Sequence, residues 1–245
     1  MTRWFQLKPV CLSATLVFAL SSPAVAGLIT NGGFESGFSS WTRSDQLGSE
    51  GTFALQTGTT SPVNGTAVPA PPGGATAAMT DAQGPGSHVM TQTFTLAAPV
   101  LSAMLAFDLF IGNRAGMFVS PSSLDFSTPA LNQQARVDIL VAGASPFSVA
   151  PADVLMNVFQ TNPGDPAVSG YTHHSVNLTT FLNAHVGTPL TLRFAETDNV
   201  LTFQLGVDNV DIDVSAAAVP EPSSALLAGA ALVAIGCLMR RKARA

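Results

Sequence analysis

Cysteine is almost absent from this sequence of 245 residues. The two cysteines, Cys11 and Cys237, both lie in apolar segments close to the chain ends. The long central part therefore has neither a disulfide nor a thiol nucleophile, and its stability must come from a hydrophobic core. A central part of about 190 residues is long enough to bury such a core as one domain.

Basic residues are equally scarce in the central part, which contains no lysine. Charged residues make up 10% of the whole chain, against about 25% in typical globular domains. Six of the ten lysines and arginines lie in the terminal segments, which leaves four arginines against fourteen acids and a net charge near −10. So acidic a domain cannot compete for phosphate backbones, which argues against nucleic acid as a partner. Neutral sugars and divalent cations are more suitable partners for it.

The first 26 residues have the pattern of a secretory signal peptide. Arg3 and Lys8 precede an apolar run from Val10 to Leu20, and a small-x-small site ends at Ala26. The apolar run has eleven residues, whereas a membrane-spanning helix needs about 20. We therefore expect cleavage after Ala26 and export of the chain.

The C-terminal segment, residues 216–245, has the pattern of a weak membrane anchor. Residues 219–222 read Val-Pro-Glu-Pro, residues 223–239 are mostly apolar, and basic residues follow at 240–244. A helix over 223–239 reaches about 25 Å, slightly less than the hydrocarbon core of a bilayer. Its alanines and glycines make the insertion energy modest. The basic end stays in the cytoplasm by the positive-inside rule, which leaves the main body outside.

This tail closely resembles the PEP-CTERM sorting signal of Gram-negative bacteria, because motif, short helix and basic end follow one another at the terminus. The motif residues are Val219, Pro220, Glu221 and Pro222. The resemblance implies that an exosortase, a transpeptidase-like membrane enzyme, processes the tail near this motif. It also implies a transient stay in the inner membrane and a destination at the cell surface or in an exopolysaccharide-rich extracellular matrix. An ordinary single-span anchor is the alternative.

Between the two targeting segments, residues 27–215 are typical of an all-β domain. Several stretches alternate between apolar and polar residues, as strands with one wet face do. They are 51–57, 88–96, 134–141, 188–194 and 203–214. The near-continuous apolar run 101–111 is typical of a strand buried on both faces. About eight or nine short strands separated by Gly- and Pro-containing loops predict an antiparallel β-sandwich.

Two long loops and two helical turns complete the predicted elements. The loops are expected at 61–75 and 120–132, where prolines cluster. The helical turns are expected at 152–160 and 179–184.

Parts of the domain resemble galactose-binding-like jelly rolls, the fold of many carbohydrate-binding modules. The opening stretch LITNGGFESGFSSWT at 28–42 and the closing stretch LRFAETDNVLTFQLGVDNVDI at 192–212 carry the resemblance, with a similar middle segment at 176–194. The resemblance implies a jelly-roll form of the sandwich. A fold does not fix a function, so it says little about sugar chemistry.

In these modules a structural Ca²⁺ commonly lies between the opening and closing strands. Carried over to this chain, the resemblance implies Glu35 and Asp208 as carboxylate ligands, with Asn31, backbone carbonyls and water in the remaining positions. Strand alternation also places the even-numbered residues from Asp208 to Val214 on one apolar face, where a carboxylate needs a neutralising partner. The alternative is that Glu35 pairs with Arg193 or accepts hydrogen bonds from backbone amides.

The motifs favour a binding or structural role over catalysis. The central part has no Gly-x-Ser-x-Gly elbow, no His-Glu-x-x-His motif and no phosphate loop. Trp41 and Tyr171 are its only tryptophan and tyrosine, which makes them the candidate ligand-binding residues for stacking on sugar rings. We expect a non-catalytic protein of the cell surface or biofilm matrix. The alternatives are a carbohydrate-binding module and, more remotely, a polysaccharide hydrolase that uses two of the acids.

Overall fold

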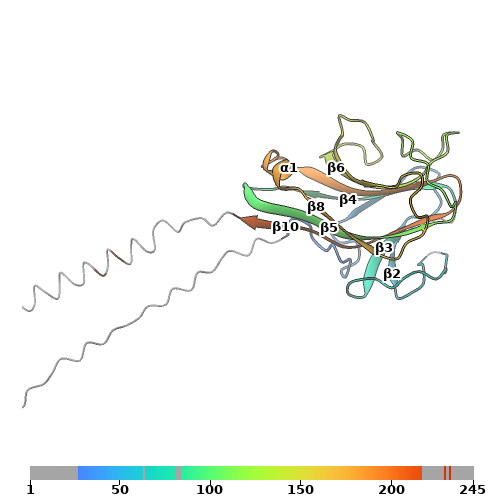
Figure 1. Cartoon of the computed structure of the whole chain (residues 1–245), viewed down its shortest axis with the longest axis horizontal. Coiled ribbons are helices and arrows are strands. Elements are labelled where there is room, and N and C mark those ends of the chain that lie inside the picture. The colour runs from blue at the N-terminus through green and yellow to red at the C-terminus, as the bar shows by residue number, and fades with distance from the viewer. Residues whose placement is uncertain (1–26, 63, 81–83, 217–228, 230–231, 233–245) are drawn as a thin grey trace, which may run out of the picture.

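The computed structural model describes residues 27–62, 64–80 and 84–216, together with residues 229 and 232 (Figure 1). The expected signal peptide, the sorting motif and nearly all of the expected C-terminal helix lie outside these residues. Within them, no helix is long and apolar enough to cross a membrane.

Ten strands in the described ranges form two five-stranded antiparallel sheets, so the predicted β-sandwich is confirmed (Figure 1). The first sheet has the order β1 (Thr42–Asp45), β4 (Gly86–Phe94), β9 (Leu190–Asp198), β6 (Gln133–Val141) and β7 (Val154–Gln160). The second has the order β2 (Phe53–Thr57), β3 (Thr76–Thr80), β10 (Phe203–Ala216), β5 (Val100–Asn113) and β8 (Thr172–Asn177). Strands β3 to β10 cross between the sheets at every connection except β6–β7, which is the jelly-roll arrangement.

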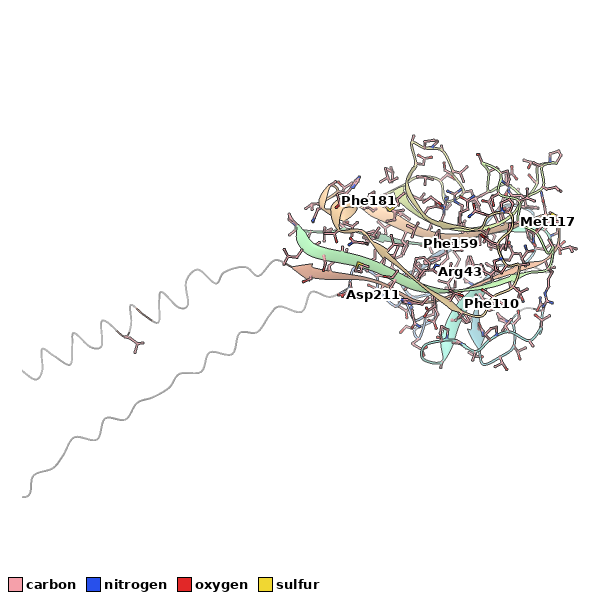
Figure 2. All side chains as sticks on the ribbon, viewed as in Figure 1. Arg43, Phe110, Met117, Phe159, Phe181 and Asp211 are labelled. Carbon is pink, nitrogen blue, oxygen red and sulfur yellow. The ribbon has the colours of Figure 1, made fainter. Side chains whose placement is uncertain are left out.

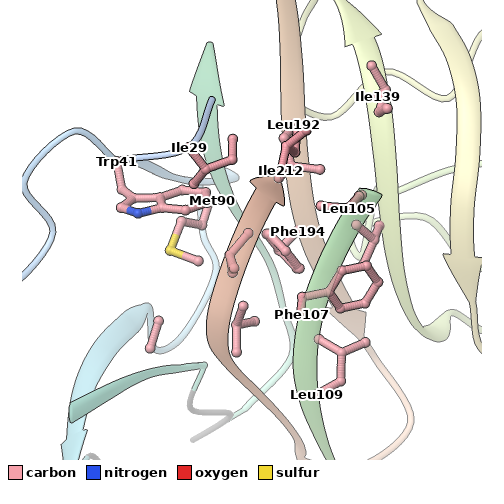
Figure 3. Close-up of a cluster of buried hydrophobic side chains, with 14 of the residues drawn as sticks. Ile29, Trp41, Met90, Leu105, Phe107, Leu109, Ile139, Leu192, Phe194 and Ile212 are labelled. Atoms are coloured by element: carbon pink, nitrogen blue, oxygen red, sulfur yellow. The ribbon is translucent and has the colours of Figure 1, made fainter. Parts of the chain in front are cut away.

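The core lies between the two sheets and follows from alternation along the strands (Figure 3). On β5, Leu105 and Phe107 point inward toward Leu192 and Phe194 of β9. The rings of Phe107 and Phe194 meet edge to face with their centroids 5.5 Å apart. Each fully buried side chain of this size stabilises the fold by about 1.5–3 kcal/mol.

Every predicted alternating stretch overlaps a strand, and the apolar run 101–111 is the central part of β5. This strand is buried on both faces only from Phe107 to Asn113, and it alternates between more and less buried residues before that. The helical turn expected at 179–184 is α1 (Thr179–Asn183).

The helical turn expected at 152–160 is wrong, because this segment is the edge strand β7. Phe159 lies opposite Val137 and Met156 lies opposite Ile139 in β6, with two irregularities of register along the pair. Each irregularity adds a residue to β7 and breaks the period-two alternation by which strands are found in a sequence.

Loops cover part of the outer face of each sheet. Over the first sheet, a small apolar cluster comprises Val89, Leu124 and Ala195, with Phe147 and Val149 packed against it. Over the second sheet, another comprises Val68, Met79 and Phe110, with Tyr171 packed against it. Part of each outer face is therefore shielded from solvent. The outer face of the second sheet contains the residues of the candidate site.

Candidate functional site

A β-bulge in β10 determines where Asp208 points. Asp208 lies opposite Asp108, but the next paired residue is Asp211, opposite Ala106, so β10 has one extra residue. Asn209 adopts a positive φ of 51° within this extra turn. Val207 before the bulge and Val210 after it both belong to the core. The prediction that Asp208 shares the apolar face of β10 is therefore wrong, and its side chain lies on the outer face of the second sheet.

Asp208 is buried there without a cationic partner among the described residues. Its Oδ1 accepts the backbone N–H of Asn209 at 2.7 Å, and its Oδ2 accepts that of Gly73 at 3.1 Å. Burial raises the pKa of Asp208 to about 6, and the charges of Asp108 and Glu35 add to the rise against the effect of the two amides. A carboxyl group in this position is half protonated in mildly acidic solution.

Glu35 lies near Asp208 and contacts the segment that begins β3. Its Oε1 accepts the backbone N–H groups of Ala75 and Thr76 at 2.8 and 3.0 Å. These amides lower the pKa of Glu35. Arg193 binds Asp138 instead, at 2.6 Å, so the alternative of a Glu35–Arg193 pair is wrong and the amide alternative is confirmed.

Asn31 organises its own loop and does not turn toward the two carboxylates. Its Nδ2 donates to the carbonyl oxygens of Gly37 and Ser39, and its Oδ1 accepts the N–H of Ser36 at 3.1 Å. The positive φ of Asn31, 54°, belongs to the same turn.

The predicted calcium ligands therefore come together only in part. Glu35 and Asp208 both bind the segment from Gly73 to Thr76, whereas the side chain of Asn31 is used elsewhere. Among the described residues, no three His, Cys, Asp or Glu side chains are arranged to hold a metal ion. Backbone carbonyls would have to supply most of the oxygen ligands that Ca²⁺ needs.

Trp41 is a core residue. Its side chain is 7% exposed, and its ring lies against Phe34 and Phe194 with centroids 5.4 and 6.0 Å away. The indole N–H donates to the carbonyl oxygen of Asn31 at 3.0 Å. The ring therefore fixes the opening loop onto the sandwich and lacks the exposed face that stacking on a sugar requires.

Tyr171 is half-buried on the outer face of the second sheet. Its ring lies 5.9 Å from that of Phe110, and its hydroxyl donates to Oε1 of Gln56 at 2.8 Å. Burial, with the nearby charges of Asp208 and Asp108, raises its pKa. Tyr171 separates the carboxylates from an open groove further along β5.

This groove encloses about 550 Å³ at the far end of the β5–β10 pair. Phe110, Gly112 and Gln204 form its floor, residues 67–69 form one wall and residues 168–170 form the other. A side chain at position 112 would come within 3.0 Å of the Phe110 ring, so glycine keeps the floor open. The volume lies within the range of small-ligand sites, about 300–1,000 Å³.

Hydrogen bonds hold both walls of the groove. The backbone N–H of Asn113 donates to the carbonyl oxygen of Ala167 at 2.9 Å, which adds the second wall to the edge of β5. Nε2 of Gln204 donates to the hydroxyl oxygen of Ser61 at 2.9 Å, which ties the first wall to β10.

Arg114 lies at the end of the groove and is exposed. Sequence reasoning missed both the groove and this arginine. The available signal was the position of Arg114, one of only four arginines in the central part, between two glycines in Gly112–Gly116.

Residues 218–244 match the family model of the PEP-CTERM protein-sorting motif. The chain thus carries this sorting signal, and the predicted identity of its tail is confirmed. The match begins two residues after the last residue of β10, Ala216. No curated protein matches the chain.

Solved structures resemble the sandwich only distantly. A carbohydrate-binding module, TmCBM61 in complex with β-1,4-galactotriose, is 13% identical with a TM-score of 0.43, over 77% of this chain and 98% of that one. The K3 cleaved adhesin domain of Lys-gingipain from Porphyromonas gingivalis is 16% identical with a TM-score of 0.47, over 76% and 98%. For the bacteriophage CBA120 tailspike protein 4, with 12% identity and a TM-score of 0.42, 77% of this chain covers only 21% of that chain. At these values the likeness carries no argument about function.

Proposed function

We propose that this chain, which carries a PEP-CTERM sorting motif, is a non-catalytic protein of the bacterial cell surface or extracellular matrix. An exosortase removes its tail near Pro220 and releases or attaches the sandwich outside the cell. The observation that carries the proposal is the match of residues 218–244 to the sorting motif directly behind the last strand.

The spacing between sandwich and motif supports this order of events. The last core residue of β10 is Val214, and the strand ends at Ala216. Cleavage within 219–222 would therefore leave every described core residue in place and only a few residues after β10. The sandwich would keep its stability after processing, as a protein that works outside the cell requires.

The sorting proposal is tested by the mass and location of the protein in its producing cells. The full chain is compared with a variant in which Pro220, Glu221 and Pro222 are replaced by alanine, while the apolar segment and basic end are kept. We expect the normal chain to lose its tail and reach the outside, and the variant to keep its tail and stay with the membrane fraction. An intact mass through Ala245 for the exported normal chain would overturn the proposal.

A second candidate function is carbohydrate binding, and the groove beside Phe110 favours it. Its apolar floor and walls, with a few polar side chains, are typical of sites that bind small ligands. Retention of the protein on extracellular polysaccharide from the producing cells tests this function. Saturable retention supports it, and no retention leaves a purely structural role.

A bound Ca²⁺ forms part of the proposal for the opposite end of the same face. Glu35 and Asp208 would hold it together with backbone oxygens, and the ion would neutralise carboxylates that have no cationic side chain beside them.

A further inference from the structure

We propose that the groove binds a single carboxylate-bearing sugar of an otherwise neutral polysaccharide and that Arg114 recognises the carboxylate. This inference rests on the proposed function, because it takes the ligand to be an extracellular glycan. It adds the chemical class of that glycan and the residue that selects it.

Among the described residues, Arg114 is the arginine whose guanidinium is free to bind an anion. Arg136 and Arg193 both bind the buried Asp138, at 2.7 and 2.6 Å. Arg43 donates to a backbone carbonyl at 2.6 Å and lies 4.3 Å above an aromatic ring. Arg114 is exposed, and its side chain makes no hydrogen bond or ion pair within the described residues. Its planar guanidinium can donate two parallel hydrogen bonds to a carboxylate.

The two ends of the groove differ in charge, because a cation lies at one end and two acids lie near the other. A domain with a net charge near −10 repels anions unless a cation is exposed locally. Arg114 supplies that cation at one end, whereas Asp108 and Asp208 lie beyond Tyr171 at the other end. A ligand with one carboxylate is therefore held in a single orientation, with its charge on Arg114.

The rest of the groove suits sugar rings better than charged peptides. Val168 is 62% exposed and offers apolar surface for the C–H face of a sugar, whereas Val68 and Phe110 line the groove but are only 6% and 4% exposed. Ser169 places a hydroxyl beside this surface, whereas the amide of the buried Gln204 is held by Ser61. Apolar walls with a few placed polar groups match the mixed surface of a saccharide.

The groove also lies far from the last residue of β10, after which the sorting motif follows. Ala216 pairs with Val100 at one end of the β5–β10 pair, and Phe203 pairs with Asn113 at the other. The 14 residues of β10 separate these ends by roughly 40 Å. Figure 2 shows Met117, three residues after Arg114, at the end of the sandwich away from Asp211. The groove therefore lies at the end of the sandwich opposite to the last residue of β10, Ala216.

Binding is measured by isothermal titration with the full chain in detergent. The probes are short neutral oligosaccharides that carry a single galacturonate, glucuronate or mannuronate, each beside its carboxyl-reduced, neutral counterpart. The variants are Arg114→Gln, Arg114→Lys and Val168→Asp, the last of which places a carboxylate on an exposed wall. Arg43→Gln is the matched control, because it removes the same charge from β1 on the other sheet. Thermal melting of each variant checks that it is folded.

We expect one uronate-bearing oligomer to bind at least 10-fold more tightly than its reduced form. Arg114→Gln should abolish this preference, Arg114→Lys should keep part of it, and Val168→Asp should weaken binding at least 10-fold. Arg43→Gln should bind like the unchanged protein. Equal binding of acidic and reduced oligomers, equal loss in both arginine-to-glutamine variants, or no uronate binding would overturn the inference. None of these outcomes depends on tail processing, so the sorting proposal stands or falls separately.

Discussion

Asp108 on β5 and Asp208 on β10 lie directly opposite each other on the outer face of the second sheet. Asn209 bridges them, because its backbone N–H donates to Asp208 at 2.7 Å and its side-chain amide donates to Asp108 at 2.7 Å. Nδ1 of His173, on the neighbouring strand β8, lies 2.9 Å from Oδ1 of Asp108. The bulge thus brings donors to two carboxylates that would otherwise repel each other.

Two substitutions of Asn209 separate the stability that comes from its side-chain hydrogen bond from the stability that comes from its tolerance of a positive φ. Asn209→Ala loses the side-chain hydrogen bond to Asp108 and also places an alanine at positive φ, which costs about 1–2 kcal/mol. Asn209→Gly loses only the hydrogen bond, worth about 1.5–3 kcal/mol for a charged acceptor. In urea unfolding, alanine should therefore destabilise the domain more than glycine by about 1 kcal/mol. Equal destabilisation would show that the backbone at the bulge is not constrained.

Substitution within the buried group of Arg136, Asp138 and Arg193 on the first sheet should strongly destabilise the fold. Asp138 accepts hydrogen bonds from both Arg136 and Arg193, and Arg193 also donates to the carbonyl oxygens of Pro146 and Ser148. Burial alone would raise the pKa of Asp138, but the hydrogen bond from Arg136 and the charges of both arginines lower it overall.

Arg193→Met should destabilise the domain by about 3–5 kcal/mol, because it leaves part of the buried Asp138 charge uncompensated. It should also free the segment around Pro146 for proteolysis, since both carbonyl contacts are lost. The double variant Asp138→Asn with Arg193→Met should cost less than the sum of the single changes in urea unfolding. Additive costs would contradict the pairing.

The sandwich was predictable because alternation along strands reports which face is buried. The same reasoning failed wherever an extra residue entered a strand. In β7, two register irregularities remove the alternation, so the sequence predicts a helical turn where the structure has a strand. In β10, apolar Val207 and Val210 are three positions apart, which was the sequence signal for the bulge.

The candidate site was less predictable, because it depends on contacts between distant segments. The sequence predicts Glu35 near β10, and the structure brings it near Asp208. Both carboxylates accept hydrogen bonds from backbone amides of the segment from Gly73 to Thr76, which the sequence does not indicate. The groove is built from loops at 67–69 and 168–170 that only the folded chain brings to the same sheet. No local pattern in either loop indicates the other.

The contributions of Asp198 and Asp208 to stability should fall as the pH rises from about 4 to about 7. Burial raises the pKa of Asp198 to about 7, against the hydrogen bond from the Gly86 amide and the nearby charge of His88. The pKa of Asp208 is raised to about 6. Because both groups bind protons more tightly in the folded state, their contribution is complete below the unfolded pKa of about 4 and is lost as each folded pKa is passed. For Asp198 the gap corresponds to roughly 4 kcal/mol.

Asp198→Asn should flatten this dependence, because the amide oxygen can still accept from Gly86 while the ionisation is removed. Melting temperatures from pH 4.5 to 8, at constant ionic strength, measure the effect. Asp165→Asn is a suitable control, since Asp165 is exposed. The same pH dependence in the unchanged protein and in Asp198→Asn would contradict the assignment.

The calcium proposal predicts that the ion stabilises the folded domain at the outer face of the second sheet. Bound Ca²⁺ would neutralise Glu35 and Asp208, so millimolar Ca²⁺ should raise the melting temperature above its value in EDTA, and most strongly at neutral pH, where Asp208 is ionised. Glu35→Gln should remove the difference between the two conditions. Asp125→Asn, on the loop over the other sheet, should leave it unchanged. Equal melting temperatures in Ca²⁺ and EDTA would instead mean that the amides of Gly73, Ala75, Thr76 and Asn209 are the main compensation for these charges.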